Sequence, residues 1–142
     1  PDVGGVKRTR TFAAHFNAEM VVIDKHRKKA NEVAEMRIIG NVEGKNVVLV
    51  DDLIDTGGTI AKAAKIIMDQ GAKSVRAFCT HPVLSGKAYD NINNSMLDEL
   101  VVTDTIPLKQ KSDKIRVLTV AELFAKAITS VTEDGSISKL FI

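Results

Sequence analysis

The sequence has few of the features that would place it in a special class of protein. It contains one cysteine, Cys79, so an intramolecular disulfide is excluded and a reducing, cytoplasmic location is expected. No apolar run approaches the ~20 residues that a membrane-spanning helix needs, and the charged start lacks the pattern of a signal peptide. The net charge of +2, from 20 basic and 18 acidic residues, gives no electrostatic reason to expect nucleic acid as a partner.

The length and composition are those of one globular domain over residues 1–142. Hydrophobic residues make up 44% and charged residues 27% of the chain. A domain of this size buries roughly 68–70% of the surface that its unfolded chain exposes, so it can form its own core. The chain starts at Pro1 and runs directly into Asp2-Val3-Gly4-Gly5. We therefore expect a piece of a longer protein.

Short β-rich runs alternate with amphipathic helical runs along the chain. This order predicts an α/β fold with a parallel sheet of about five strands flanked by helices. Residues 47–50 are apolar without alternation, as expected of a strand that is covered on both faces. The expected strands are residues 20–23, 46–50, 74–80, 99–103 and 115–118, and the expected helices are residues 7–16, 60–70 and 119–132.

The strongest local signal is the turn that follows residues 46–50. Glycines let the backbone approach a ligand closely, threonines supply hydroxyl donors, and a helix N-terminus adds positive potential, which together favour a phosphate. In open α/β sheets, ligands bind at this carboxyl edge of the strands. The turn reads Asp51-Asp52-Leu53-Ile54-Asp55-Thr56-Gly57-Gly58-Thr59.

The three aspartates of this turn, Asp51, Asp52 and Asp55, make its chemistry more specific. An ATP-binding P-loop would carry a lysine, which is missing here. Carboxylates beside a phosphate would repel it, so they are expected to have another partner. Adjacent sugar hydroxyls or a bridging Mg²⁺ are the natural partners. The turn therefore predicts a sugar phosphate held at both ends. The alternative is that the aspartates are ordinary turn and helix-capping residues of a strand–helix junction.

Residues 24–44 show no helical stripe, and we expect them to form a long loop, which in a compact domain is usually functional or mobile. Basic residues lie at its start. On an extended loop the side chains of Lys25 and Arg27 point to the same side. A lysine supplies a compact charge and an arginine a flat fork, both suited to phosphate oxygens. The alternative is a solvated charge run.

Two further residues are weaker candidates. Cys79 and His81 have metal-ligand side chains, but a metal site needs a second pair of ligands. Cys79 is expected to be a small buried residue, and His81 to shape a loop.

The segment 47–59, VVLVDDLIDTGGT, resembles the ribose-phosphate motif of proteins with the type I phosphoribosyltransferase fold. The wider chain is more similar to the C-terminal half of the ribose-phosphate pyrophosphokinases (phosphoribosyl pyrophosphate synthetases). The supporting segments are residues 1–8, 24–27, 40–45, 80–86 and 93–95.

This resemblance implies an enzyme that transfers the pyrophosphoryl group of ATP to O1 of ribose 5-phosphate with Mg²⁺. It implies a catalytic role for Lys25 and Arg27, with Arg27 also binding substrate, and a metal-ligand role for Asp2. Asp51, with Asp52 beside it, would bind the ring hydroxyls. The 5-phosphate would be held by Asp55, Thr56, Gly57, Gly58 and Thr59.

In that family the N-terminal half and a neighbouring subunit hold much of the ATP. We therefore expect this chain to bind ribose 5-phosphate, to have little or no kinase activity alone, and to belong to a homo-oligomer in its full-length form. Two alternatives stay open. A base-utilising phosphoribosyltransferase shares the acidic turn, although no spare segment is present for a base-covering hood. A non-catalytic regulatory homologue would keep the turn for binding only, although the presence of both Lys25 and Arg27 argues against it.

Overall fold

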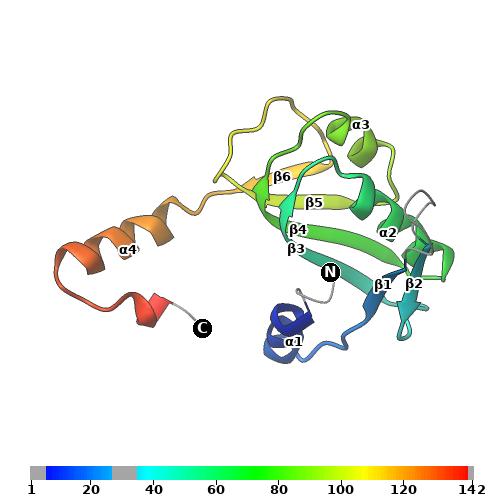
Figure 1. Ribbon diagram of the computed structural model, residues 1–142, viewed down its shortest axis with the longest axis horizontal. Helices are drawn as coiled ribbons and strands as arrows, with labels where there is room; N and C mark the ends of the chain where they lie inside the picture. Colours follow the sequence, from blue (N-terminus) through cyan, green and yellow to red (C-terminus); the bar gives the residue numbers. More distant parts are fainter. Residues whose placement is uncertain (1–5, 27–34, 141–142) are drawn as a thin grey trace.

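A four-stranded parallel sheet lies at the centre of the chain (Figure 1). The computed structural model describes residues 6–26 and 35–140, without the side chains of residues 7, 8, 25, 26 and 35. The strand order is β3-β4-β5-β6, and each neighbouring pair is parallel. The predicted α/β class is confirmed, with four parallel strands in place of about five. The strands are β3 (Asn46–Ile54), β4 (Ser74–Pro82), β5 (Glu99–Thr103) and β6 (Ile115–Leu118).

Two helices, α2 (Gly58–Asp69) and α3 (Ala88–Asn93), pack with the sheet to form the core. The apolar stripe predicted on the first of them is buried, and its buried members are Ile60, Ala63, Ala64 and Ile67. Gly71, with φ of 85°, follows the end of α2 as predicted. The short helix α3 was not expected, because six residues make fewer than two turns and show no clear periodicity.

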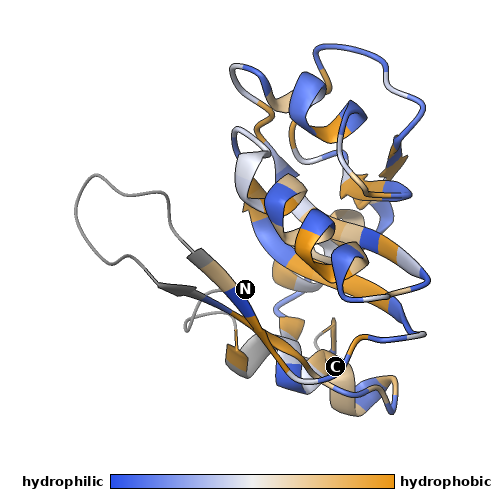
Figure 2. Cartoon of the chain, turned by 90° about the vertical axis from the view of Figure 1, so that its right-hand side faces the viewer, coloured by the Kyte–Doolittle hydropathy of each residue, from blue (hydrophilic) through white to orange (hydrophobic). Residues whose placement is uncertain are grey.

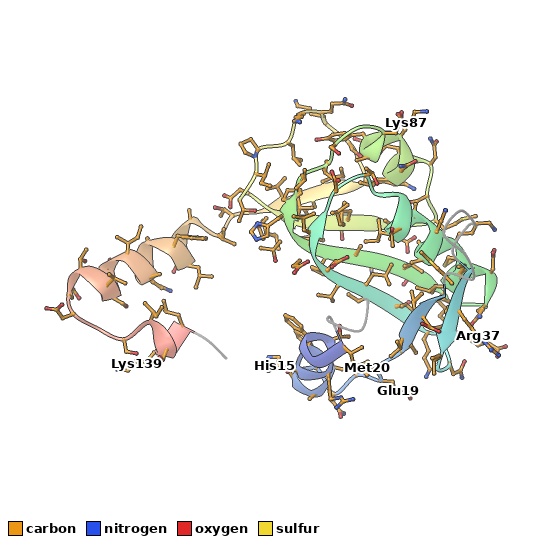
Figure 3. The ribbon with its side chains drawn as sticks, viewed as in Figure 1. His15, Glu19, Met20, Arg37, Lys87 and Lys139 are labelled. Carbon is orange, nitrogen blue, oxygen red and sulfur yellow. The ribbon has the colours of Figure 1, made fainter. Side chains whose placement is uncertain are left out.

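The other face of the sheet is apolar and partly open. Val48 and Phe78, which point to this face, are 52% and 38% exposed. A cavity of about 640 Å³ lies between them and α1 (Val6–His15), whose Phe12 and Phe16 also line it. The link between α1 and the next strand adds Glu19 and Met20 to the lining (Figure 3).

Two antiparallel strands, β1 (Val22–His26) and β2 (Glu35–Ile39), form a separate small sheet that stands away from the main sheet (Figure 2). The irregular loop expected at residues 24–44 is therefore wrong for residues 24–26 and 35–39, and residues 27–34 lie outside the described residues. The strand expected at residues 20–23 begins at Val22 and is antiparallel. The pair is held at its base, because Ile38 is buried and Ile23 and Met36 pack against the core. Charged residues between these apolar positions hid the alternation that marks a half-buried strand.

The C-terminal arm consists of α4 (Ala121–Thr132) and the short helix η2 (Ile137–Leu140), and it extends away from the sheet (Figure 1). The helices expected at residues 119–132 and 7–16 are confirmed, with ends shifted by one or two residues. No residue of α4 is buried. Within residues 6–26 and 35–140, no helix has the length and apolar character needed to cross a membrane.

Candidate functional site

β3 carries two neighbouring aspartates near its carboxyl end, and their side chains leave the strand in different directions. The strand continues to Ile54, beyond its predicted end at Val50, so both Asp51 and Asp52 are strand residues. Successive strand side chains point to opposite faces, and Asp51 lines the cavity beside α1. Its carboxylate accepts a 3.0 Å hydrogen bond from the backbone N–H of Asp52. Burial raises the pKa of the Asp51 carboxyl above its ordinary value.

The turn after β3 is held from one side through its carbonyl groups. We call residues 54–58 the glycine turn and residues 84–91 the support segment. Three consecutive carbonyl oxygens of the glycine turn each accept one hydrogen bond from the support segment. The bonds run from Leu84 N to Ile54 O (3.1 Å), from Ser85 N to Asp55 O (3.0 Å) and from Asn91 Nδ2 to Thr56 O (2.8 Å).

The N–H groups of the same peptides point the other way. In a trans peptide the C=O and N–H bonds have opposite directions, and the described residues contain no cis peptide bond. The N–H groups of Asp55, Thr56 and Gly57 are therefore directed away from the support segment. Within the described part of the chain, neither Thr56 N nor Gly57 N donates to a backbone carbonyl. Consecutive N–H groups arranged in this way, next to a helix N-terminus, form an anion-binding concavity.

Helix α3 leaves little room for a side chain at Gly57. Its φ of 71° is in the left-handed region, which favours glycine. A Cβ atom at this position would lie 3.3 Å from Ala88 O and 3.4 Å from Ile92 Cγ1. Gly58, by contrast, has its nearest such neighbour, Asn91 Nδ2, at 3.9 Å. The structure thus gives the first glycine a packing role in addition to the predicted role of admitting a ligand.

The carboxylate of Asp55 also contacts the support segment. Ser85 Oγ donates a hydrogen bond to Asp55 Oδ1, so Ser85 binds both the backbone and the side chain of this aspartate. Asp52, Asp55, Thr56 and Thr59 are all exposed, as ligand-binding groups must be. The structure therefore brings the predicted residues 51–59 together at one edge of the sheet.

The other predicted site residues lie elsewhere or outside the described residues. Lys25 belongs to β1, where its backbone is paired with Met36. Arg27 and Asp2 fall outside the described ranges, so their catalytic and metal-binding roles stay predictions. Among the residues that the structure describes, no group of three or more His, Cys, Asp or Glu side chains is placed to hold a metal ion.

Cys79 is buried, as predicted, whereas His81, which was expected to shape a loop, is a residue of β4 paired with Leu53. Cys79 is 4% exposed, and its thiol donates to the carbonyl oxygens of His81 and Asp52, at 3.3 and 3.6 Å. Burial raises the pKa of this thiol to about 11, so it is protonated at neutral pH. The Nδ1 atom of His81 lies 3.1 Å from Oγ1 of Thr105, which lies just after β5.

Sequence analysis did not identify Ser85 and Asn91 as part of the site. They contact residues 30 and 35 positions earlier in the chain, and no local pattern encodes a contact of that range. The available signal was the Ser85-Gly86 pair, which marks a turn. It supported the family resemblance without indicating which residues the turn contacts.

An α/β domain in which a parallel strand carries paired aspartates near its carboxyl end and leads into a glycine turn is typical of the phosphoribosyltransferase type of fold. The family model described as "Phosphoribosyl synthetase-associated domain" matches residues 9–142. The chain therefore belongs to the phosphoribosyl synthetase-associated domain family.

Similar proteins agree with this assignment. The chain is 56% identical to a ribose-phosphate pyrophosphokinase of Campylobacter jejuni and 54% identical to one of Wolinella succinogenes. Each match covers 100% of this chain and 46% of the relative, so the chain spans about half the length of these proteins. The crystal structure of phosphoribosylpyrophosphate synthetase from Mycobacterium smegmatis has a TM-score of 0.85 at 35% identity, over 93% of this chain and 43% of that one. These matches establish the family, and they do not establish the narrower expectation that the chain is a C-terminal half.

Proposed function

We propose that this chain is the ribose 5-phosphate-binding part of a ribose-phosphate pyrophosphokinase. The full enzyme would transfer the pyrophosphoryl group of ATP to O1 of ribose 5-phosphate, giving phosphoribosyl pyrophosphate and AMP. The observation that carries the proposal is the glycine turn, where the N–H groups of Asp55, Thr56 and Gly57 are directed to one side, next to the strand that carries Asp51 and Asp52. The names of the relatives support this choice of reaction.

The two ends of the sugar phosphate would meet different chemistry. The 5-phosphate would accept hydrogen bonds from the N–H groups of the glycine turn and from the hydroxyls of Thr56 and Thr59. Asp51, with Asp52 beside it, would accept hydrogen bonds from the ring hydroxyls. Since burial disfavours the ionised form of Asp51, a hydroxyl that donates to its carboxylate supplies the stabilisation that water no longer gives.

Mg²⁺ is compatible with the side chains that are present. This ion keeps several waters and binds through one or two carboxylates together with substrate phosphates. The exposed carboxylates near the end of β3 suit such a site, which needs no cluster of three protein ligands. When bound, Mg²⁺ would neutralise negative charge on the phosphoryl oxygens.

Lys25 and Arg27 are proposed to act on the migrating phosphoryl group. In phosphoryl transfer the protein mainly positions the reactants and neutralises developing charge. Lys25 lies near the end of β1, at the start of the segment that carries Arg27. We propose that most ATP contacts come from parts of the longer protein outside this chain, that the full-length protein is a cytoplasmic homo-oligomer, and that this chain alone has little kinase activity.

The direct test measures ligand binding and turnover separately. Calorimetric titration should show that ribose 5-phosphate binds more tightly than ribose or inorganic phosphate, because only the first ligand contacts both ends of the site. The variant Asp51→Asn should weaken binding of ribose 5-phosphate and leave binding of inorganic phosphate nearly unchanged. Equal affinity of the wild-type chain for ribose 5-phosphate and phosphate would contradict the proposal. Near-normal conversion of ATP to AMP by this chain would refute the statement that it is inactive alone.

Two assays separate the alternatives. Pyrophosphate release from phosphoribosyl pyrophosphate in the presence of a nucleobase would identify a base-utilising phosphoribosyltransferase. For a regulatory homologue, the test is Lys25→Ala in the full-length protein, which should sharply lower turnover and leave affinity for ribose 5-phosphate nearly intact. An unchanged rate would favour a regulatory homologue.

A further inference from the structure

The support segment does more than pack against the glycine turn. We propose that Ser85 and Asn91 are positioning residues, which hold the peptides of the glycine turn in the orientation that binds the 5-phosphate. This inference rests on the proposed function, because it names the residues that prepare the same site. Neither side chain needs to contact the ligand for this role.

Asn91 fixes the peptide between Thr56 and Gly57. Its Nδ2 donates to Thr56 O at 2.8 Å, so the Gly57 N–H of the same peptide points away from α3. Rotation of this peptide would turn a carbonyl oxygen toward the phosphate, and the negative end of that dipole would repel it. The Asn91 hydrogen bond opposes this rotation.

Asn91 is mounted on a well-anchored helix. Its neighbours in α3, Ala88 and Ile92, are 0% exposed, and Tyr89 is 5% exposed. The hydroxyl oxygen of Tyr89 accepts hydrogen bonds of 3.0 and 3.2 Å from the backbone N–H groups of residues 109 and 110. A donor on a rigid element holds its acceptor more accurately than one on a loop.

Ser85 fixes the preceding peptide and a carboxylate at the same time. Its N–H donates to Asp55 O at 3.0 Å, and its hydroxyl donates to Asp55 Oδ1. A carboxylate beside an anion site is unfavourable, and this hydrogen bond keeps one oxygen of Asp55 directed at the support segment. Asp55 is thereby assigned to holding the turn, while its backbone N–H is left for the phosphate.

The residue before Ser85 has a strained backbone that the surrounding structure maintains. Leu84 has φ of 45°, which is uncommon for a residue with a side chain, and it is only 3% exposed. Its N–H donates to Ile54 O at 3.1 Å. Residues in such conformations persist where packing holds them and cluster at functional sites. The strain at Leu84 brings Ser85 to the glycine turn.

The test compares binding of two ligands by variants of the full-length protein that contains this chain. Asn91→Leu removes the donor and keeps a side chain that branches at Cγ, and Ser85→Ala removes the hydroxyl. Each should weaken binding of ribose 5-phosphate about tenfold, which corresponds to about 1.4 kcal/mol, and should change binding of ribose less than about twofold. Ser85→Thr, which keeps a hydroxyl, should restore affinity. Asn94→Leu on the exposed end of α3 and Ser130→Ala on α4 are the matched controls and should leave both affinities unchanged.

A second measurement needs no ligand. Hydrogen–deuterium exchange of a peptide spanning residues 54–62 should be faster in Asn91→Leu than in Asn94→Leu. Each exchange rate is measured at the same interval below the melting temperature of the variant, so that a difference in global stability does not explain the result. Equal exchange, or unchanged affinity for ribose 5-phosphate, would overturn the positioning role. A parallel loss of ribose affinity and melting temperature would show that the two residues only stabilise the fold. If the wild-type protein bound no ribose 5-phosphate, the proposed function would fail, and the exchange result would still decide the role of Asn91.

Discussion

Gly57 and Ala88 approach each other so closely that a Cβ atom on Gly57 would lie 3.3 Å from the carbonyl oxygen of Ala88. The contact joins the glycine turn to α3, and it is tighter than most contacts that a real Cβ makes. The φ of 71° at Gly57 adds a second reason for glycine at this position. Both constraints act on the stability of the turn, and they can be separated by mutation.

Gly57→Ala should lower the free energy of unfolding by about 2 kcal/mol, of which about 1–2 kcal/mol comes from the left-handed conformation. Gly44→Ala is the matched control, because Gly44 has φ of 68° and no neighbour within 4 Å of an added Cβ. The control variant should lose only the part of the free energy of unfolding that comes from the left-handed backbone conformation. Urea denaturation measures both values. Equal losses in the two variants would show that the contact with Ala88 carries no cost.

The course of β3 and α2 could be read from the sequence, because their patterns are local. An unbroken apolar run marks a strand, and the i, i+3, i+4 stripe from Ile60 to Ile67 marks a helix. The expectation that the strand is covered on both faces was wrong, because Val48 is 52% exposed in this chain. The hairpin β1–β2 could not be read in the same way. Its core-facing positions, the partly buried Ile23 and the buried Ile38, lie on separate strands and become one surface only after the strands pair.

The candidate site could also be predicted only in part. The acidic and glycine residues of segment 51–59 are contiguous, so their chemistry was visible before the structure. Ser85 and Asn91 act through long-range hydrogen bonds to main-chain atoms, and a main-chain carbonyl has no signature in the sequence. The hydrogen bond from Ser85 Oγ to the Asp55 carboxylate, which distinguishes Asp55 from the other two aspartates, joins residues 30 positions apart and required the structure.

Asp51→Asn should increase stability at neutral pH while it weakens binding of ribose 5-phosphate. Burial raises the pKa of the Asp51 carboxyl above the ordinary value of 3.8. Because the pKa of this carboxyl is higher in the folded state than in the unfolded state, protonation favours the folded state. This contribution to stability is fully present below the unfolded-state pKa and is lost as the pH rises through the folded-state pKa. At pH 7 the ionised carboxylate is therefore unfavourable, and asparagine relieves it.

Melting temperatures from pH 3 to pH 8, without ligand or Mg²⁺, measure this effect. The stability difference between Asp51→Asn and wild type should be present at pH 7 and should shrink as the pH falls toward 3.8, the ordinary Asp value. Asp113→Asn is a control for a carboxylate on the exposed surface, because Asp69, also exposed, is ion-paired with Lys65. A variant that is less stable than wild type at pH 7 would show that Asp51 contributes to stability in its ionised form.

Cys79 should be unreactive in the folded chain and should make stability fall at high pH. Its pKa of about 11 is above the ordinary 9.0, so the thiol is neutral in the folded state between these values. The folded state binds more protons than the unfolded state in this window, and stability is lost as the pH rises from 9 to 11. Denaturation of wild type and Cys79→Ala at several pH values gives the difference. Rapid alkylation of native protein by iodoacetamide at pH 8 would contradict the burial of this thiol.

The C-terminal arm should contribute little to the stability of this chain. Ile128 of α4 is 62% exposed, whereas Ile67 of α2 is 0% exposed, so the same substitution at the two helices tests burial directly. Ile67→Ala should cost about 2–5 kcal/mol, since it removes buried methyl groups and leaves a cavity. Ile128→Ala should stay within about 0.5 kcal/mol of wild type, as expected for an exposed site. Urea denaturation of both variants at several protein concentrations checks the comparison. A loss of more than 2 kcal/mol at Ile128 would mean that α4 is covered in solution, and a dependence of that loss on concentration would place the covering surface on a second copy of the chain.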